Sequence, residues 1–332
     1  MPIALLKFPT DLLRDVLKQC NPFELYCLSK CSKRVRNSVK LGGERNWKIS
    51  YRGWNEINIS GDGRKYHFYC TKNPEDYFKT EHARNYKSMK IPMEGGATFF
   101  YLLKTFGICI VESLEIQSGN LYNFLQITKV LIEKDMEIEN FCIGKTLDLK
   151  DVVNVMPLIS QMNIIKEFEC LTMLPPNSCY QLTTFPNCIR IYNSVWFDVS
   201  QLLNCTCTRI ELGDSRLCNQ DLNVFLQNWK KTKAFPNLQW LKVESKNMDN
   251  QSAILDIVPP IMSMENPRQQ VSIQFGKNDY VIIYDAVRVY KEDGREAWLR
   301  VTLGSVPKLE FLVGNPDNTK VKEVDASDDE EE

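Results

Sequence analysis

The chain has 332 residues, of which 43% are hydrophobic and 25% charged, the balance of a folded protein with a packed core. Its length predicts two domains, or a large repeat domain with a small module. The net charge of −1 conceals an uneven distribution: residues 1–50 hold ten Lys and Arg against four Asp and Glu, whereas the last ten residues hold seven acids and no base. No apolar run is long enough to span a bilayer or to form a secretory core, so neither a membrane protein nor a secreted one is expected.

The first forty residues predict three short helices. Four apolar residues recur at helical spacing in the first of them, which should end near Cys20: Leu12, Leu13, Val16 and Leu17. Asn21 can cap a second helix, with Pro22 at its first position and Glu24 completing a capping box. Ser32 can cap a third. A bundle this small has few core positions, so it needs a partner, either the rest of the chain or another protein.

The order of these residues resembles the F-box, over about residues 4–45. That family shows a Leu-Pro start, a Leu-rich first helix, a Pro-x-acid-Leu second start and a Ser-basic third start. Here Phe8 replaces the usual Leu, and Val35 stands where an aromatic is common. The resemblance implies docking onto the Skp-family adaptor of a cullin-type ubiquitin ligase. The residues it implies for adaptor binding are Phe8, Pro9, Leu12, Leu13, Leu17, Pro22, Leu25 and Leu28. The alternative is a helical lid that packs on its own domain.

A basic run in the same segment has a simpler interpretation than a nucleic-acid site. Its members alternate with Val35 and Val39 on a predicted helix, and no aromatic residues interleave with them for base stacking. We therefore expect a solvated helix face, complementary to an acidic adaptor, made by Lys30, Lys33, Arg34, Arg36 and Lys40.

The remaining chain repeats a six-residue frame, apolar-x-x-apolar-x-apolar, at start-to-start spacings of 21 to 31 residues. It occurs at 86–91, 111–116, 138–143, 165–170, 186–191, 207–212 and 238–243. Apolar positions at helical spacing lie between some frames, as in 121–134, 149–159 and 217–231. Strand, turn and helix at this period are typical of leucine-rich-type repeats, which stack into a curved parallel sheet backed by helices. The alternative is a conventional α/β domain.

Two hairpin signals frame the repeats. Residues 47–70 alternate apolar and polar residues around Gly61-Asp62-Gly63, and two strand-like runs flank Asp293-Gly294. The predicted fold class is thus mixed α/β. Its predicted divisions are a helical module at 4–45, a β-rich cap at 46–85, a solenoid at 86–260, a β-hairpin cap at 261–315 and a disordered acidic tail at 316–332 with Ser327 as a candidate phosphorylation site.

Within the solenoid, the middle residues of the frames should stack in one buried row: Met89, Leu114, Phe141, Phe168, Ile189, Ile210 and Leu241. Residues that flank the middle position should then face the opposite, open side of the sheet. Among them, the candidates for target binding are Asn140, Arg190, Arg209, Trp240 and Lys242. For Trp240 the alternative is partial cover by the adjoining cap.

Residues 217–245, with support from the Asp293-Gly294 hairpin, resemble the nematode-expanded F-box proteins that carry a type 2 F-box-associated domain. The resemblance implies a substrate-recruiting subunit of a ubiquitin ligase, with a Skp-family adaptor, a cullin and an unknown target protein as partners. A repeat-based interaction scaffold unconnected to ubiquitination is the alternative.

Twelve cysteines and two histidines limit the chemistry of the chain. Without a signal peptide the cysteines should be free thiols in a reducing compartment, and there is no C-x-x-C pair for zinc. His67 and His82 lie in no recognisable catalytic motif. We expect no catalytic residue, no cofactor and no metal, and a location in the cytoplasm, the nucleus or both.

Overall fold

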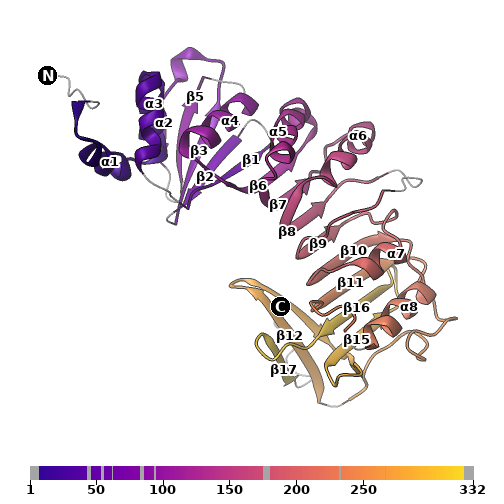
Figure 1. The fold of residues 1–332 in the computed structure, drawn as a ribbon. Coiled ribbons are helices and arrows are strands. Elements are labelled where there is room, and N and C mark those ends of the chain that lie inside the picture. Colours follow the sequence, from indigo (N-terminus) through magenta and orange to yellow (C-terminus); the bar gives the residue numbers. More distant parts are fainter. Residues whose placement is uncertain are drawn as a thin grey trace. The chain divides into compact units, whose positions relative to one another are not determined.

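The structure, a computed structural model, describes residues 7–42, 46–53, 56–61, 63–82, 86–92, 95–174, 180–231, 233–265 and 267–324. The chain forms two compact units, residues 1–165 and 166–332. Figure 1 labels the helices and strands, and each unit is described by itself.

Three short helices open the first unit: α1 (Thr10–Gln19), α2 (Pro22–Cys31) and α3 (Lys33–Val39). The predicted caps are confirmed. The Asn21 side chain accepts hydrogen bonds from the backbone N–H groups of Phe23 and Glu24, and the Glu24 carboxylate accepts one from the Asn21 N–H at 2.7 Å. The Ser32 hydroxyl caps α3 by accepting from the Val35 N–H. Pro9 is the N-cap residue of α1 and therefore lies one position before the first turn of the helix.

The sheet of the first unit has the strand order β7-β6-β1-β2-β3-β5-β4. Its strands are β1 (Lys48–Arg52), β2 (Glu56–Gly61), β3 (Arg64–Cys70), β4 (Thr80–His82), β5 (Lys87–Ile91), β6 (Ile110–Ile116) and β7 (Glu137–Ile143). The helices that follow strands in this unit are α4 (Gly95–Phe106), α5 (Leu121–Glu133) and α6 (Leu149–Ile159). The predicted antiparallel pairing of β2 and β3 is confirmed.

The predicted position of the first repeat frame is wrong, because its strand is not the neighbour of the second frame's strand in the sheet. Residues 86–91 do form strand β5, but β3, β2 and β1 lie between it and β6. The hairpin assigned to a separate cap pairs into the sheet instead, because β1 joins β6 and β3 joins β5 in parallel. Met89 therefore does not neighbour Leu114, whereas Leu114 does lie opposite Phe141 as predicted.

The main sheet of the second unit has the order β8-β9-β10-β11-β16-β15-β14. Its strands are β8 (Asn163–Cys170), which begins at the boundary between the units, β9 (Cys188–Ile191), β10 (Arg209–Ser215), β11 (Trp240–Ser245), β14 (Val287–Tyr290), β15 (Glu296–Thr302) and β16 (Lys308–Val313). The four strands β8 to β11 run parallel, and the later strands add antiparallel. The predicted hairpin of β14 and β15 is confirmed.

The predicted buried row is confirmed across these four parallel strands. Ile189 lies opposite both Phe168 and Ile210, and Ile210 lies opposite Leu241. The helices of this unit are α7 (Val199–Asn204) and α8 (Asn219–Lys230). The predicted face of α8 is wholly buried, and the Trp229 ring meets the Phe311 ring edge-on at a centroid distance of 4.8 Å. The mixed α/β class holds, while the leucine-rich-repeat-like character stays a prediction.

A second, three-stranded sheet in this unit has the order β13-β12-β17, made of β12 (Arg268–Gly276), β13 (Asp279–Tyr284) and β17 (Thr319–Val324). Its buried face shares a core with the main sheet, made of Trp240, Val271, Ile273, Ile283, Ala286, Trp298 and Leu312. The prediction of disorder from residue 316 is wrong for 319–324, because β17 pairs with β12 along its whole length. Residues 325–332, which include Ser327, lie outside the described residues.

Candidate functional site

The predicted adaptor-binding residues divide into two groups. Leu13, Leu17, Pro22 and Leu25 are buried within the chain's own packing. Leu12 is 48% exposed, Pro9 is exposed, and Phe8 and Leu28 are partly exposed. A partner could therefore reach only the second group directly, and the first group holds the helices in place.

The side of α2 that carries Phe23 and Tyr26 packs on the sheet of the first unit. The Phe23 ring meets the rings of Tyr66 and Phe68 edge-on, at centroid distances of 5.3 and 5.0 Å. Tyr26 packs edge-on against Phe68 and is fully buried, and this burial raises the pKa of its hydroxyl. The alternative of a helical lid therefore describes one side of these helices, while Leu12 and Pro9 remain on an open side.

The basic run is only partly a solvated face. The Lys30 ammonium lies 3.6 Å from the Tyr101 ring centroid, and the Arg36 guanidinium lies 4.9 Å from the same centroid. Both cations therefore stack on an aromatic ring of α4. Lys30, Lys33, Arg34 and Lys40 are nevertheless exposed as expected, and Arg36 is partly exposed.

A row of alternating charges crosses one face of the main sheet in the second unit, partly exposed on β9 to β11 and buried at Glu310 on β16. Successive strands place one member each directly opposite the next, in the order Glu169, Arg190, Glu211, Lys242, Glu310 and Arg300. We call these six residues the charged row. Cross-strand neighbours of opposite sign attract one another, so the row stabilises the register of the sheet.

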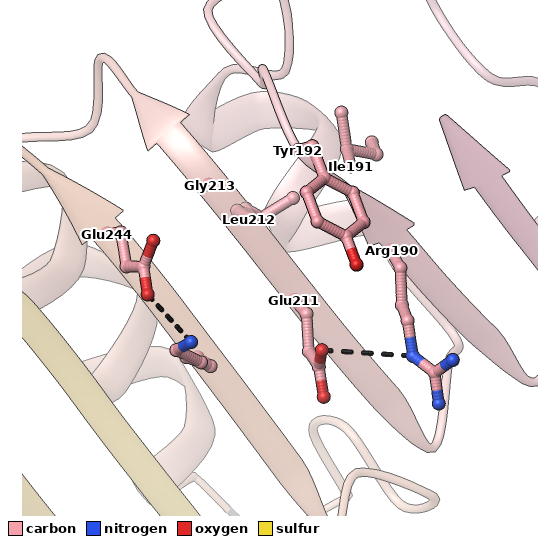
Figure 2. Close-up of a pocket in the computed structure, with 8 residues that line it drawn as sticks. Arg190, Ile191, Tyr192, Glu211, Leu212, Gly213 and Glu244 are labelled. Carbon is pink, nitrogen blue, oxygen red and sulfur yellow. Dashed lines mark ion pairs between the residues drawn. The ribbon is translucent and has the colours of Figure 1, made fainter. Parts of the chain in front are cut away.

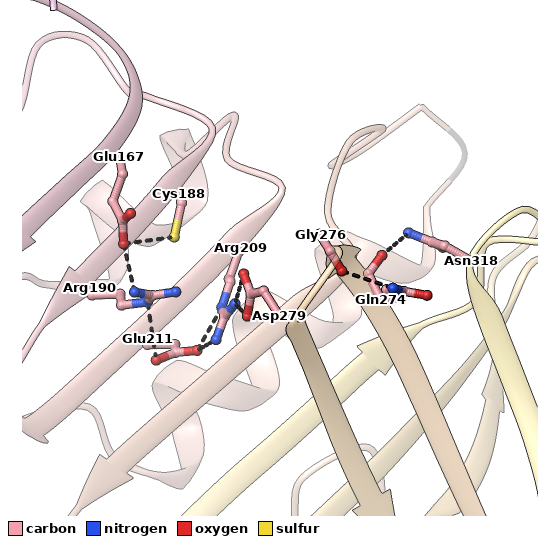
Figure 3. A network of polar contacts seen from close by, with 9 residues as sticks. All are labelled: Glu167, Cys188, Arg190, Arg209, Glu211, Gln274, Gly276, Asp279 and Asn318. Atoms are coloured by element: carbon pink, nitrogen blue, oxygen red, sulfur yellow. Dashed lines mark hydrogen bonds and ion pairs between the residues drawn. The ribbon is translucent and has the colours of Figure 1, made fainter. Parts of the chain in front are cut away.

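The charged row is extended by ion pairs to residues beside it, part of which Figure 3 shows. Arg190 bonds Glu167 at 2.7 Å and lies 3.8 Å from Glu211. Burial raises the pKa of the Glu167 carboxyl, and the Arg190 charge opposes that rise. On the next strand, Lys242 bonds Glu244 at 2.6 Å. These pairs are partly exposed, so a bound partner would compete with them at modest cost.

A shallow hollow of about 120 Å³ opens at one side of the charged row. Figure 2 shows the Arg190 guanidinium and the Glu211 carboxylate in it, with the Tyr192 ring above them. Tyr192 is exposed, and Gly213 is required beside it because a Cβ there would lie 2.7 Å from the Tyr192 carbonyl oxygen. Sequence reasoning missed Tyr192, although it directly follows the 186–191 frame and is of a residue type common in interfaces.

The predicted target-binding residues have different fates. Trp240 is only 2% exposed, so its choice as a contact residue is wrong; it lies beneath the three-stranded sheet. Arg209 is mostly buried, bonds both carboxylate oxygens of Asp279 at 2.8 and 3.0 Å, and stacks over Phe275. Arg209 thus fastens the small sheet to the main one. Arg190 and Lys242 line the hollow.

Asn140 lies on β7 of the first unit, where its side-chain N–H donates to the Glu112 carbonyl oxygen at 2.8 Å. Within the second unit, the structure brings together Arg190 and Lys242, with Arg209 beside them as a structural residue. A further contact role for Asn140 stays a prediction.

The described residues hold no cluster of three or more His, Cys, Asp or Glu side chains that could bind a metal ion. The buried thiols are poor nucleophiles, since burial raises the pKa of Cys170 to about 12 and a hydrogen bond with Cys205 raises that of Cys207. Nor does any helix in the described ranges have the length and hydropathy to cross a membrane.

Comparison with known families agrees with this division of the chain. The family model of the F-box domain matches residues 5–42, and a model described as F-box associated matches residues 164–243. No curated protein and no solved structure shows a significant match. The matched class is one of adaptor and recognition modules, which are typically not enzymes, and an F-box implies a ubiquitin-ligase adaptor role in general. The chain thus carries an F-box domain followed by an F-box associated domain.

Proposed function

We propose that the chain is the substrate-recruiting subunit of a cullin-type ubiquitin ligase. Its N-terminal helices bind a Skp-family adaptor, and its second unit binds a target protein. The observation that supports adaptor binding is an open apolar surface within the F-box match, centred on Leu12 and Pro9, on helices whose other side is fixed to the core by Phe23 and Tyr26.

The second unit is the proposed target-binding part because it holds the F-box associated match and the charged row with its hollow. Arg190, Lys242 and Tyr192 are the residues proposed to contact the target, since they are reachable and are not needed to hold the two sheets together. The protein would act inside the cell, in the cytoplasm, the nucleus or both.

Co-purification tests this function. The full chain, expressed with a Skp-family adaptor and a cullin, should elute with both from a size-exclusion column. Elution of the chain alone at concentrations well above 1 µM would contradict the ligase role and would favour the interaction scaffold unconnected to ubiquitination.

A further inference from the structure

Strand β13 differs from the other edge strands of the described sheets. Natural sheets protect their edges with charged residues or by keeping edge strands very short. Here β4 has three residues, β14 has four with Arg288 among them, and β17 carries Lys320, Lys322 and Glu323. In β13 the run Tyr280 to Tyr284 holds no charge, and Asp279 before it is bonded to Arg209.

The free edge of β13 offers a regular set of backbone groups. The Asp285 N–H donates to the Gln269 carbonyl at 3.1 Å, and Tyr284 lies opposite Gln270. Because hydrogen-bonded and non-bonded pairs alternate in an antiparallel ladder, the N–H and C=O groups of Tyr280, Ile282 and Tyr284 point away from β12. Among the described strands, none pairs with β13 on that side.

That edge faces the charged row. On the other edge of the small sheet, the Asn318 side chain bonds Gln239 at 3.2 Å, just before β11 begins. Along β11 the small sheet then covers Trp240, and the next side chain on the same face is Lys242 of the charged row. Since β12 and β17 lie toward Gln239, the free edge of β13 lies toward Lys242.

The length of β13 matches the charged row. Its start is fixed to β10 by Arg209 and Asp279, beside the network in Figure 3, and its end lies near β15, where Arg300 attracts Asp285. The strands β10, β11, β16 and β15 span about 14 Å at about 4.8 Å per strand, and five extended residues span about 17 Å. An extended peptide along this edge would therefore pass over the partly exposed Glu211 and Lys242, and then over Arg300 and the buried Glu310, which pairs with Lys308.

We propose that the target is bound as an extended segment that adds to the free edge of β13 as a fourth strand. Backbone hydrogen bonds to Tyr280, Ile282 and Tyr284 supply affinity, and charged side chains of the segment, alternating in sign, are selected by the charged row. We call the strip of the main sheet beside the free edge of β13 the slot. Its floor is formed by β10 and β11, which continue to Gly213 and Glu244, so a single extended strand can lie on it. The inference rests on the proposed target-binding role of the second unit.

The probe is a displayed library of random nonapeptides, selected on the full chain, with the best peptides then synthesised and titrated. Ile282→Pro removes an N–H that points to the free edge and leaves the β12 pairing intact. It should weaken peptide binding at least about tenfold. Val321→Pro is the matched control, because the Gln274 N–H donates to the Asn318 carbonyl and the alternation then places the Val321 N–H on the outer edge of β17. This control should leave the dissociation constant within about twofold of wild type.

N-methylation of the peptide gives an independent readout. Two versions of the peptide are compared, one methylated on the backbone nitrogens of its odd-numbered residues and one on those of its even-numbered residues. One version should lose binding and the other should keep it, since only alternate N–H groups of an added strand face β13. Failure to enrich any peptide, equal binding to Ile282→Pro, or loss at every methylated position would overturn the proposal. So would a wild-type dimer that Ile282→Pro dissociates, which would assign the edge to a second copy of the chain. Adaptor co-purification of the same variants separates failure of this site from failure of the ligase role.

Discussion

Truncation of Trp240 should reveal how firmly the three-stranded sheet is held. The side chain lies in the core shared by the two sheets and is fully covered. An aromatic side chain of this size buries about 200 Å², which at about 25 cal/mol per Å² is about 5 kcal/mol of transfer free energy. Measured truncations of buried aromatics cost about 3–5 kcal/mol. We therefore expect Trp240→Ala to lower the free energy of unfolding of the second unit by about 3–5 kcal/mol.

Urea denaturation followed by circular dichroism measures this change, and Tyr192→Ala is the matched control. Tyr192 is an aromatic residue of the same unit that is 56% exposed. Its truncation should change the free energy of unfolding by no more than about 0.5 kcal/mol. A loss of less than about 1 kcal/mol for Trp240→Ala would show that the small sheet does not cover this face of β11, and the slot beside β13 would lose its basis.

Three further predictions concern single side chains. Arg209→Ala should lower the free energy of unfolding, measured by urea titration, by about 1.5–3 kcal/mol, because it breaks the charged hydrogen bonds to Asp279. The control Arg288→Ala should change it by no more than about 0.5 kcal/mol. Equal effects of the two substitutions would contradict the role of Arg209 in fastening the small sheet. A thiol reagent at pH 8 should label the exposed Cys31 and Cys109 rapidly but leave Cys170 unlabelled in the folded protein, since a pKa of about 12 leaves roughly one thiolate in ten thousand; mass spectrometry that finds fast modification of Cys170 would refute its burial. The Arg268 hydrogen bond lowers the pKa of Asp285, so this pair stabilises the fold above the unfolded pKa of about 4 and loses its effect as the pH falls below that; Asp285→Asn should flatten the acid side of the stability curve, and an unchanged curve would speak against the pair.

Local patterns in the sequence predicted local structure well. The caps at Asn21 and Ser32 depend on side chains within three residues, so they could be assigned from the order of residues alone. The same holds for the buried face of α8 and for the frames that became β6 to β11, because an apolar period fixes which side of an element is buried. The row from Phe168 to Leu241 follows from that period once the strands are parallel.

Long-range pairing could not be predicted in the same way. Nothing local shows that β1 and β3 enter the sheet between β5 and β6, since a strand carries no signal for which neighbour it will join. The composition of residues 319–324 predicts part of a polar tail. They form a strand only because their backbone pairs with β12. Trp240 looked like a contact residue because its side of the sheet was expected to be open; the three-stranded sheet that covers it is made of segments distant in the sequence.

The F-box surface is the part of the account that one binding measurement tests most directly. Isothermal titration of a Skp-family adaptor into the full chain should give a dissociation constant of about 1 µM or tighter. Leu12→Asp should weaken it more than about a hundredfold, because an unpaired charge would be buried in the interface. Val153→Asp is the matched control, since Val153 is an aliphatic residue on α6 with the same 48% exposure as Leu12. Loss of binding in Leu12→Asp alone, with both variants melting as wild type does, is the predicted result. Equal binding by wild type and Leu12→Asp, or no binding by wild type, would contradict the assignment of this chain as a ligase subunit.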